Sequence, residues 1–210
     1  MSKMVSISAM RYVGAKLLEA SRTTAKAVAA NNVSLADVVD FFKKEYEAPV
    51  TEVMYMQGNS MAPTFNAKAE PGTIGEKLLL RKFKNPCAKT VFVGDVVALQ
   101  DPDSDRVLIR RVAAEEEQEM VSSNPEDKAF YLEQGHCWVL ADNETLQPNE
   151  AVDSRTLGPV KYSDLVGRVM YSSRSEVDHG SVENSEEAME LDAPVLECEF
   201  DPDTFCRPEK

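Results

Sequence analysis

Residues 91–112, VFVGDVVALQDPDSDRVLIRRV, decide the fold class of this chain. Two runs rich in Val, Leu and Ile, Val91–Leu99 and Val107–Val112, flank the cluster Asp101-Pro102-Asp103-Ser104. Runs of this length and composition favour strands, whereas Asp, Pro and Ser favour turns. The stretch therefore predicts two strands separated by a turn.

Similar short segments recur on both sides of this stretch. They are rich in Val, Leu and aromatic residues and are separated by turn-forming clusters: Lys77–Lys82, Trp138–Leu140 and Val166–Tyr171. No helix-length periodic stretch alternates with them, which argues against a parallel βαβ sheet. We therefore expect a mainly β fold, with an antiparallel and partly closed β domain over residues 49–174.

The composition suits a soluble globular core with an acidic surplus. The 210 residues are 43% hydrophobic and 28% charged, and the formal net charge is −13. Phosphate neutralisation needs a basic face, so this charge argues against a nucleic-acid-binding protein. No run of about 18 apolar residues predicts a transmembrane helix. The four cysteines form no C-x-x-C pair, and we expect neither a metal nor a cofactor.

Residues 1–48 form a basic, helical N-terminal segment in this interpretation. Residues 1–30 carry five bases and one acid and are rich in Ser and Ala, as in an organellar transit peptide. The alternative is an exposed amphipathic helix that stays on the mature protein, and the sequence leaves both open. From Ser34, a capping-box pattern with Asp37 precedes an apolar stripe and then Pro49, which predicts a helix.

Residues 175–210 form an acidic tail. From Glu176 onward the tail has twelve acidic residues against Arg207 and Lys210. Few of its apolar residues are adjacent, so we expect it to be extended unless a partner orders it. Cys198 and Cys206 form a disulfide or remain free thiols, and both alternatives stay open.

The most informative string for function is Gly58-Asn59-Ser60-Met61-Ala62-Pro63-Thr64-Phe65. A serine between small or polar residues, followed by a proline-fixed turn, holds its hydroxyl beside exposed backbone N–H groups. An acyl-transfer nucleophile and its oxyanion hole require this geometry. Alone, the string is a weak signal, because Ser-Met pairs are common in ordinary loops.

Further strings follow the serine in a fixed order: Gly75–Lys82, Gly94–Pro102, Val107–Val112, Gly135–Asn143, Asp153–Val160 and Val166–Val169. In order and spacing they resemble the sequence boxes of the type I signal peptidases, and most of all those of the mitochondrial inner membrane peptidases. That family uses a Ser/Lys catalytic dyad. The resemblance covers residues 50–172 and implies a signal-peptidase-type fold.

The resemblance also implies roles for individual residues. Ser60 falls on the nucleophile, and its backbone N–H falls on one oxyanion donor. Residues on supporting positions shape the turn of the serine or brace the loop next to the base: Gly58, Met61, Pro63, Asp153 and Arg155. The substrate of such a site is an extended peptide that adds a strand beside it.

Two positions depart from the family pattern. The place of the base lysine, directly before Arg111-Val112, is taken by Arg110, and the serine that orients the lysine is replaced by Ala151. A buried lysine becomes a base when its pKa falls toward 7, whereas arginine stays protonated with a pKa above about 12. Arg110 can therefore donate a hydrogen bond to Ser60 but cannot take its proton.

Other candidate bases are weaker. His136 precedes a predicted strand and is interpreted as structural, and His179 lies in the polar tail. Lys82 and Lys84 lie near the substrate-flanking strand of the family, but their spacing does not direct either side chain at Ser60.

Two interpretations of function follow from the resemblance. The first is a signal-peptidase-like serine endopeptidase of reduced activity that processes targeting peptides at the mitochondrial inner membrane. The second is an inactive pseudopeptidase, acting as a peptide-binding or scaffold subunit of a membrane complex. Both imply a mitochondrial protein attached peripherally to the inner membrane, through residues 1–30 or through other subunits. A β module unrelated to proteolysis is a third alternative, which the matched series of boxes disfavours.

Overall fold

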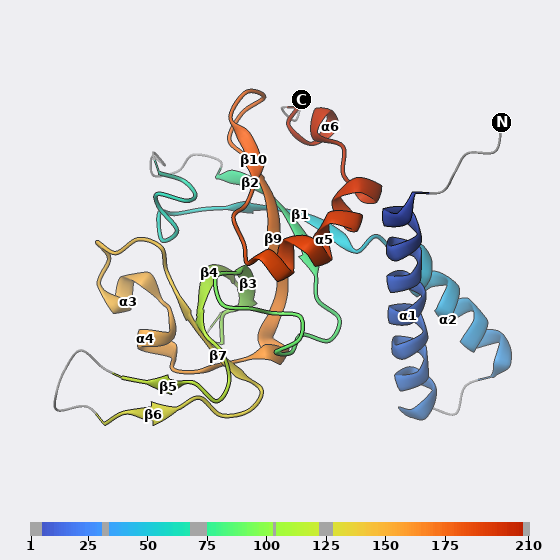
Figure 1. The fold of residues 1–210 in the computed structure, drawn as a ribbon, viewed down its shortest axis with the longest axis horizontal. Helices are drawn as coiled ribbons and strands as arrows, with labels where there is room; N and C mark the ends of the chain where they lie inside the picture. Colours follow the sequence, from blue (N-terminus) through green and yellow to red (C-terminus); the bar gives the residue numbers. More distant parts are fainter. Residues whose placement is uncertain (1–5, 31–33, 68–74, 103, 122–127, 208–210) are drawn as a thin grey trace.

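A curled antiparallel sheet occupies the centre of the molecule, with a helical hairpin beside it and a long C-terminal helix between the two (Figure 1). This arrangement comes from a computed structural model that describes residues 6–30, 34–67, 75–102, 104–121 and 128–207. Residues 1–5 of the N-terminal segment and Asp103 of the predicted turn lie outside the described residues. The mainly β, antiparallel fold expected from the sequence is confirmed.

The central sheet has eight strands in the order β1-β2-β9-β3-β4-β7-β8, with β10 also paired to β9. Their bounds are β1 Thr51–Met56, β2 Glu76–Lys82, β3 Val96–Gln100, β4 Val107–Ala114, β7 His136–Leu140, β8 Val160–Lys161, β9 Leu165–Ser173 and β10 His179–Ser181. A separate hairpin joins β5 (Glu119–Met120) to β6 (Phe130–Tyr131). Register shifts interrupt the β2–β9, β3–β9 and β4–β7 pairs, and such bulges bend and twist a sheet.

The predicted strand over Val91–Leu99 begins later than expected. Gly94 has a φ of 96°, and the Asp95 carboxylate accepts the Phe92 N–H at 3.0 Å, so residues 92–95 form a turn. The strand β3 therefore starts at Val96. Its residues Val96 to Leu99 are all buried, as expected for a strand covered on both faces.

One part of the core fixes the loop that follows β1. Met61 is fully buried and Phe65 is 1% exposed, and both pack with Leu78, Val96 and Ile109 from β2, β3 and β4. Burial of a side chain of this size contributes about 1.5–3 kcal/mol. The loop that carries Ser60 is therefore anchored to the core by two residues that follow the serine.

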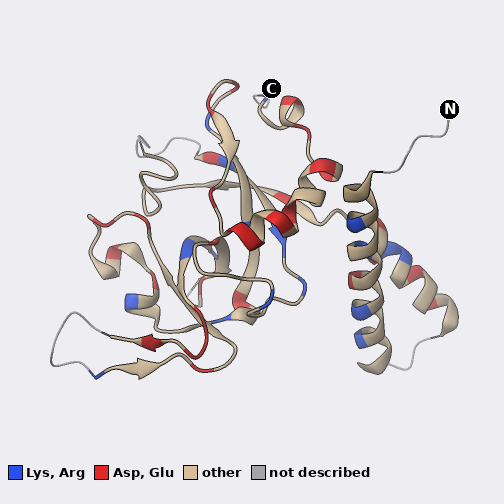
Figure 2. Ribbon diagram, in the orientation of Figure 1, with Lys and Arg blue, Asp and Glu red and all other residues tan. Residues whose placement is uncertain are grey.

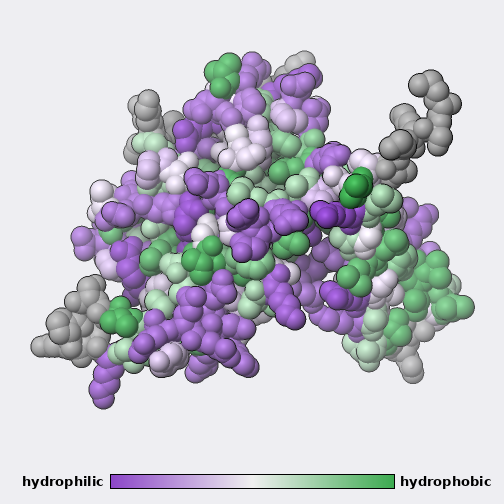
Figure 3. All heavy atoms as spheres, viewed as in Figure 1, coloured by the Kyte–Doolittle hydropathy of each residue, from purple (hydrophilic) through white to green (hydrophobic). Residues whose placement is uncertain are grey.

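The N-terminal segment folds into two helices, α1 (Ile7–Ala30) and α2 (Leu35–Glu47), which pack against each other. The predicted capping box is present: the Ser34 hydroxyl accepts the Asp37 N–H, and the Asp37 carboxylate accepts the Ser34 N–H at 3.1 Å. Hydrophobic side chains gather over this hairpin (Figure 3). Among them Ile7 is 70% exposed and Met10 is 56% exposed.

The expectation of an extended acidic tail is wrong. Residues Glu186–Glu199 form helix α5, which contacts α1 and β9, and Pro202–Phe205 form the short helix α6. The Ser185 hydroxyl caps α5, and acidic residues in its first turn complement the helix dipole. Figure 2 shows acidic residues along α5, but one of them, Asp192, is only 3% exposed and binds Arg168 in the sheet. The tail is ordered by ion pairs with distant parts of the chain, such as Asp192 with Arg168, and the composition of the tail alone does not show such pairs.

Candidate active site

Ser60 lies in the loop directly after β1, and neighbouring segments hold its backbone. The Asn143 N–H donates to the Ser60 carbonyl at 3.0 Å, and the Asn143 side-chain amide donates to the Asn59 carbonyl at 2.9 Å. Met61 is buried directly below. The serine side chain is therefore presented on a fixed backbone while remaining partly exposed.

Arg110 of β4 lies beside the Ser60 hydroxyl. Its Nη1 donates to Ser60 Oγ at 3.0 Å, so the two residues that the sequence predicts to meet are in contact. Arg110 pairs with Val97 across β3–β4, which sets its position along the sheet. Its side chain is buried, with 3% of the residue exposed.

Backbone carbonyls fix the guanidinium of Arg110. Nε donates to the Val152 carbonyl at 3.2 Å, Nη1 also donates to the Ile109 carbonyl, and Nη2 donates to the Ala151 carbonyl. Burial lowers the pKa of Arg110 to about 10, against the opposing effect of the Asp153 and Asp101 carboxylates. The group is still a cation at neutral pH. A cation that donates to Ser60 Oγ cannot accept the hydroxyl proton.

Asp153 and Arg155 brace the loop that supplies two of those carbonyls. The fully buried Asp153 carboxylate accepts the Ala141 N–H at 3.0 Å and the Arg155 Nη2 at 2.8 Å. Burial alone would raise the pKa of Asp153, but Arg155 and the backbone donors outweigh it and hold the pKa below its ordinary value. Asp153 also caps the short helix α4 (Ser154–Leu157), which follows α3 (Pro148–Ala151). The pair keeps Ala151 and Val152 against Arg110.

The sequence did not predict a second ion pair, between Arg111 and Asp142, which is linked to the serine loop through Thr64. Arg111 binds Asp142 through two hydrogen bonds of 2.9 and 2.8 Å, and Asp142 accepts the Thr64 hydroxyl at 2.6 Å. Because successive residues of a strand point to opposite faces, Arg111 cannot follow Arg110 toward Ser60. The proximity of Asp142 and Asn143 to the serine loop carried no local signal in the sequence.

The other candidate bases have contacts of their own. His136 Nδ1 lies 3.2 Å from the Gln134 carbonyl, His179 Nδ1 lies 2.6 Å from the Tyr171 hydroxyl, and Lys84 binds Glu45 at 2.6 Å. All four cysteines, including Cys198 and Cys206, are free thiols. Within the described ranges, no cluster of His, Cys, Asp and Glu could hold a metal ion.

Strand β1 forms one end of the sheet and leads into the serine loop. The Lys82 N–H donates to the Val50 carbonyl at 2.8 Å, so alternate residues from Val50 onward bond to β2. In an antiparallel pair the intervening residues turn their backbone groups away from the partner strand. The N–H and C=O of Val53 therefore face the outer edge, and its side chain is 46% exposed. This edge can pair with an extended peptide.

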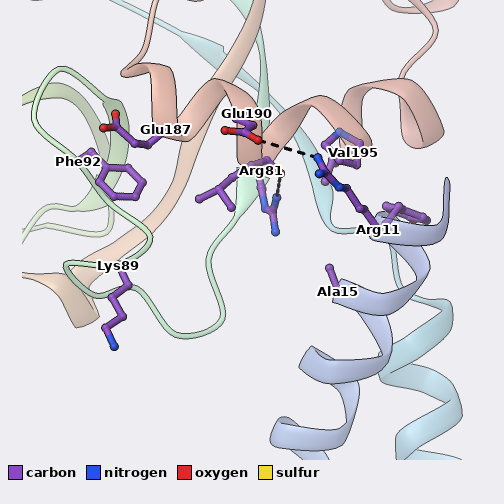
Figure 4. A pocket seen from close by; sticks show the side chains of 11 residues that line it. Arg11, Ala15, Arg81, Lys89, Phe92, Glu187, Glu190 and Val195 are labelled. Carbon is purple, nitrogen blue, oxygen red and sulfur yellow. Dashed lines mark hydrogen bonds and ion pairs between the residues drawn. The ribbon is translucent and has the colours of Figure 1, made fainter. Parts of the chain in front are cut away.

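A cavity of about 560 Å³ lies elsewhere, between α1 and α5 (Figure 4). Its wall carries basic residues, among them Arg11 and Arg81, and the acidic residues Glu187 and Glu190. Arg11 lies 4.0 Å from Glu190, and Arg81 binds Asp192 at 3.0 Å. Two of the basic residues are therefore paired with carboxylates, and Ser60 is not among the lining residues.

Comparison with known proteins identifies the family. No family model matches the chain. The protein named mitochondrial ATP-independent inner membrane protease subunit 2 of Arabidopsis thaliana is 40% identical over 210 residues, which cover 99% of this chain and 100% of that protein. The chain belongs to the mitochondrial inner membrane protease family.

Other members of this family are more distant. Mitochondrial inner membrane protease subunit 1 of Schizosaccharomyces pombe is 30% identical over 121 residues, covering 57% of this chain and 71% of that protein. Mitochondrial ATP-independent inner membrane protease subunit 1a of Arabidopsis thaliana is 27% identical over 167 residues, covering 77% and 92%. The resemblance to signal-peptidase-type proteins is confirmed, and with it a peptidase-like role at the mitochondrial inner membrane. Among the described helices, none is long and apolar enough to cross a bilayer.

Proposed function

We propose that this chain is a serine-peptidase-like subunit of an inner membrane protease, which binds extended targeting peptides along β1 and hydrolyses them slowly at Ser60. The contact that carries the proposal is the 3.0 Å hydrogen bond from Arg110 Nη1 to Ser60 Oγ. It places the serine beside a polar partner, four residues after the end of β1. The same contact limits the rate, because the partner is a cation.

The energetic argument separates positioning from proton transfer. The fixed loop can still orient a peptide and offer backbone donors to an oxyanion, and such contributions survive the loss of a base. General-base help is typically worth about 10²- to 10⁴-fold in rate. Ser60-dependent hydrolysis should therefore persist at a rate lower by that factor than with a lysine base.

A second candidate is an inactive peptide-binding or scaffold subunit. It is favoured by Ala151, whose backbone carbonyl binds the guanidinium but whose side chain offers no hydroxyl to orient a base. In this case the site would hold peptides for another subunit. The relatives are named as protease subunits, which is compatible with either role.

We further propose that the helical hairpin attaches the chain peripherally to the membrane. Ile7, Met10, Leu17 and Leu18 are 70%, 56%, 42% and 51% exposed and lie on one face of α1 at helical spacing. Arg11 lies beside this face on the helix. An apolar stripe flanked by bases is suited to an anionic membrane surface. Alkaline carbonate should release the protein from isolated mitochondria, and retention among integral proteins would contradict peripheral attachment.

A binding assay tests the use of the β1 edge. Proline at an edge position removes an outward N–H without breaking the ladder to β2. Val53→Pro should therefore weaken binding of a labelled inner-membrane presequence peptide by about 2- to 10-fold, the value of one hydrogen bond. The matched control Val53→Ala keeps the N–H and should bind like the unmodified protein. Equal affinities for both variants would contradict peptide pairing at this edge.

A cleavage assay tests the role of Ser60. With the protein in excess over the presequence peptide, slow cleavage should be detectable by mass spectrometry and absent in Ser60→Ala. Ser163→Ala, at an exposed serine whose hydroxyl donates to Asp164, serves as the control and should cleave normally. Peptide binding without any Ser60-dependent cleavage would favour the second candidate. Failure both to bind and to cleave would exclude the two candidates together.

A further inference from the structure

The corner formed by Ser60 and Arg110 offers hydrogen-bond donors to a ligand. Ser60 Oγ accepts from Arg110, so its own hydroxyl proton points elsewhere, and within the described part of the chain it has no protein acceptor. The same holds for the Ser60 backbone N–H. Four of the five guanidinium N–H groups bind Ser60 and three carbonyls, which leaves one on Nη2. A ligand that satisfies this corner must be an acceptor.

The charge of the corner is compensated only at longer range, by Asp153 and Asp101. Within the described ranges Arg110 takes part in no ion pair, and its neighbours Arg111 and Arg155 are each paired with a carboxylate. A buried charge without a counter-ion is costly, and an anion brought to it gains from the low local dielectric. The corner therefore favours an anionic acceptor over a neutral one.

The direction of β1 indicates which anion. The strand ends at Met56, and four residues later the chain reaches Ser60. A peptide that pairs in parallel with the outer edge of β1 would point the C-terminal end of its backbone toward these donors. The group at the end of a peptide backbone that is both planar and anionic is its C-terminal carboxylate, which can accept several charge-assisted hydrogen bonds.

We propose that Ser60 and Arg110 form a receptor for the C-terminal carboxylate of an extended peptide. This inference rests on the proposed peptide binding along β1. The hydroxyl and N–H of Ser60 and the free N–H on Nη2 would donate to the two carboxylate oxygens, with Arg110 as counter-ion. The site would then bind a cleaved peptide, which ends in a new carboxylate, more tightly than an intact one. It would act as a product-holding site.

Three labelled peptides of one sequence test the proposal: a free C-terminal acid, the C-terminal amide, and the amide with Asp as its last residue. Hydrogen bonds to charged groups contribute about 1.5–3 kcal/mol, so the free acid should bind about 10- to 100-fold more tightly than the amide. The Asp-containing amide separates a side-chain carboxylate from a terminal one and should bind like the plain amide.

Two variants assign the preference to the corner. Arg110→Met should reduce the ratio of acid to amide affinity to about one, whereas Arg110→Lys, which keeps the charge, should retain part of it. The ratio is measured within each variant, so a partly unfolded fraction cancels, and the unmodified protein alone already tests the proposal. Equal binding of acid and amide by the unmodified protein would overturn this inference and leave peptide binding at β1 intact. Preference for the Asp-containing amide over the acid would also overturn it, and binding of no peptide would overturn both.

Discussion

Two arginines are buried among the residues that the structure describes, and they differ in what surrounds them. Arg168 of β9, 1% exposed, binds Asp192 of α5 at 2.7 and 3.0 Å and Asp95 at 2.8 Å. Burial alone would lower the pKa of Arg168, but these carboxylates outweigh it and raise the pKa. Arg110 of β4, 3% exposed, binds one hydroxyl and three carbonyls, and burial lowers its pKa to about 10.

The comparison distinguishes a structural arginine from one held for a ligand. The charge of Arg168 is compensated inside the fold, where it joins the sheet to α5. Among the described residues no carboxylate forms an ion pair with Arg110, and Asp153 and Asp101 act on it only at longer range. One of its N–H groups donates to the Ser60 hydroxyl. A buried cation without a counter-ion stabilises the fold little, so its place beside a partly exposed serine calls for an explanation in function.

Restoring a base at Arg110 should produce the largest effect. The double substitution Arg110→Lys with Ala151→Ser supplies an amine whose pKa can fall toward neutrality and a hydroxyl to orient it. Cleavage of a presequence peptide should rise by about 10²- to 10⁴-fold, measured as a single-turnover rate. Arg110→Lys alone should gain less, because its ammonium lacks the orienting hydroxyl.

Adding Ser60→Ala to the double variant is the control for this gain and should abolish it. If the double variant cleaves no faster than the unmodified protein, the slow rate does not originate in the missing base.

Removing each buried arginine should affect stability unequally. Arg168→Met leaves Asp95 buried without its counter-ion and leaves Asp192 with Arg81 alone, so it should lower the free energy of unfolding by about 3–5 kcal/mol. Arg110→Met leaves no buried carboxylate without its partner. It removes a desolvated charge, which offsets the lost hydrogen bonds to carbonyls, so the free energy of unfolding should fall by only about 1 kcal/mol. Urea denaturation measures both. Arg11→Met, at an exposed side chain, is the control and should be near neutral. An equal decrease in the free energy of unfolding for Arg168→Met and Arg110→Met would contradict the distinction between a structural arginine and one held for a ligand.

Glu199 extends the comparison to a half-buried carboxylate whose oxygens accept several hydrogen bonds. Its oxygens accept the N–H groups of Val50 and Thr51 at 3.0 Å and the hydroxyl of Tyr12, which ties α5 to α1 and to the start of β1. Burial alone would raise the pKa of Glu199, but these donors outweigh it and lower the pKa below 4.5. Glu199→Gln should cost about 1–3 kcal/mol at neutral pH.

The pH dependence gives the sign of this effect. A carboxylate with a depressed folded pKa contributes stability above its unfolded pKa and loses it as the pH falls through the folded pKa. The advantage of the unmodified protein over Glu199→Gln should therefore be constant above about pH 5 and shrink below about pH 4.5. A difference independent of pH down to pH 3 would show that the charge of Glu199 is not responsible.

Much of the fold could be predicted because its signals are local. The alternation of aliphatic runs and turn formers located β2, β3, β4, β7 and β9, and the capping box of Ser34 located α2. Helix α5 could not be predicted this way. Its sequence is acidic, and its order depends on Asp192 meeting Arg168 and on Glu199 meeting β1, contacts between residues far apart in the chain.

In the candidate site, too, some contacts could be predicted from the sequence and others could not. The contact of Ser60 with Arg110 and the pairing of Asp153 with Arg155 were both implied by the resemblance to the signal peptidases. The binding of the serine loop by Asn143 and the bond from Asp142 to Thr64 require the folded sheet to bring the two segments together. Neither has a signature in its own stretch of sequence.

The protonation state of Arg110 in the folded protein tests the central claim most directly. The ¹³C chemical shift of its guanidinium carbon, assigned by its loss in Arg110→Lys and followed from pH 6 to pH 11, reports that state. The account predicts a protonated guanidinium at pH 7 that begins to titrate near pH 10. A neutral guanidine at pH 7 would contradict it, because Arg110 could then accept the proton of Ser60 and serve as the base.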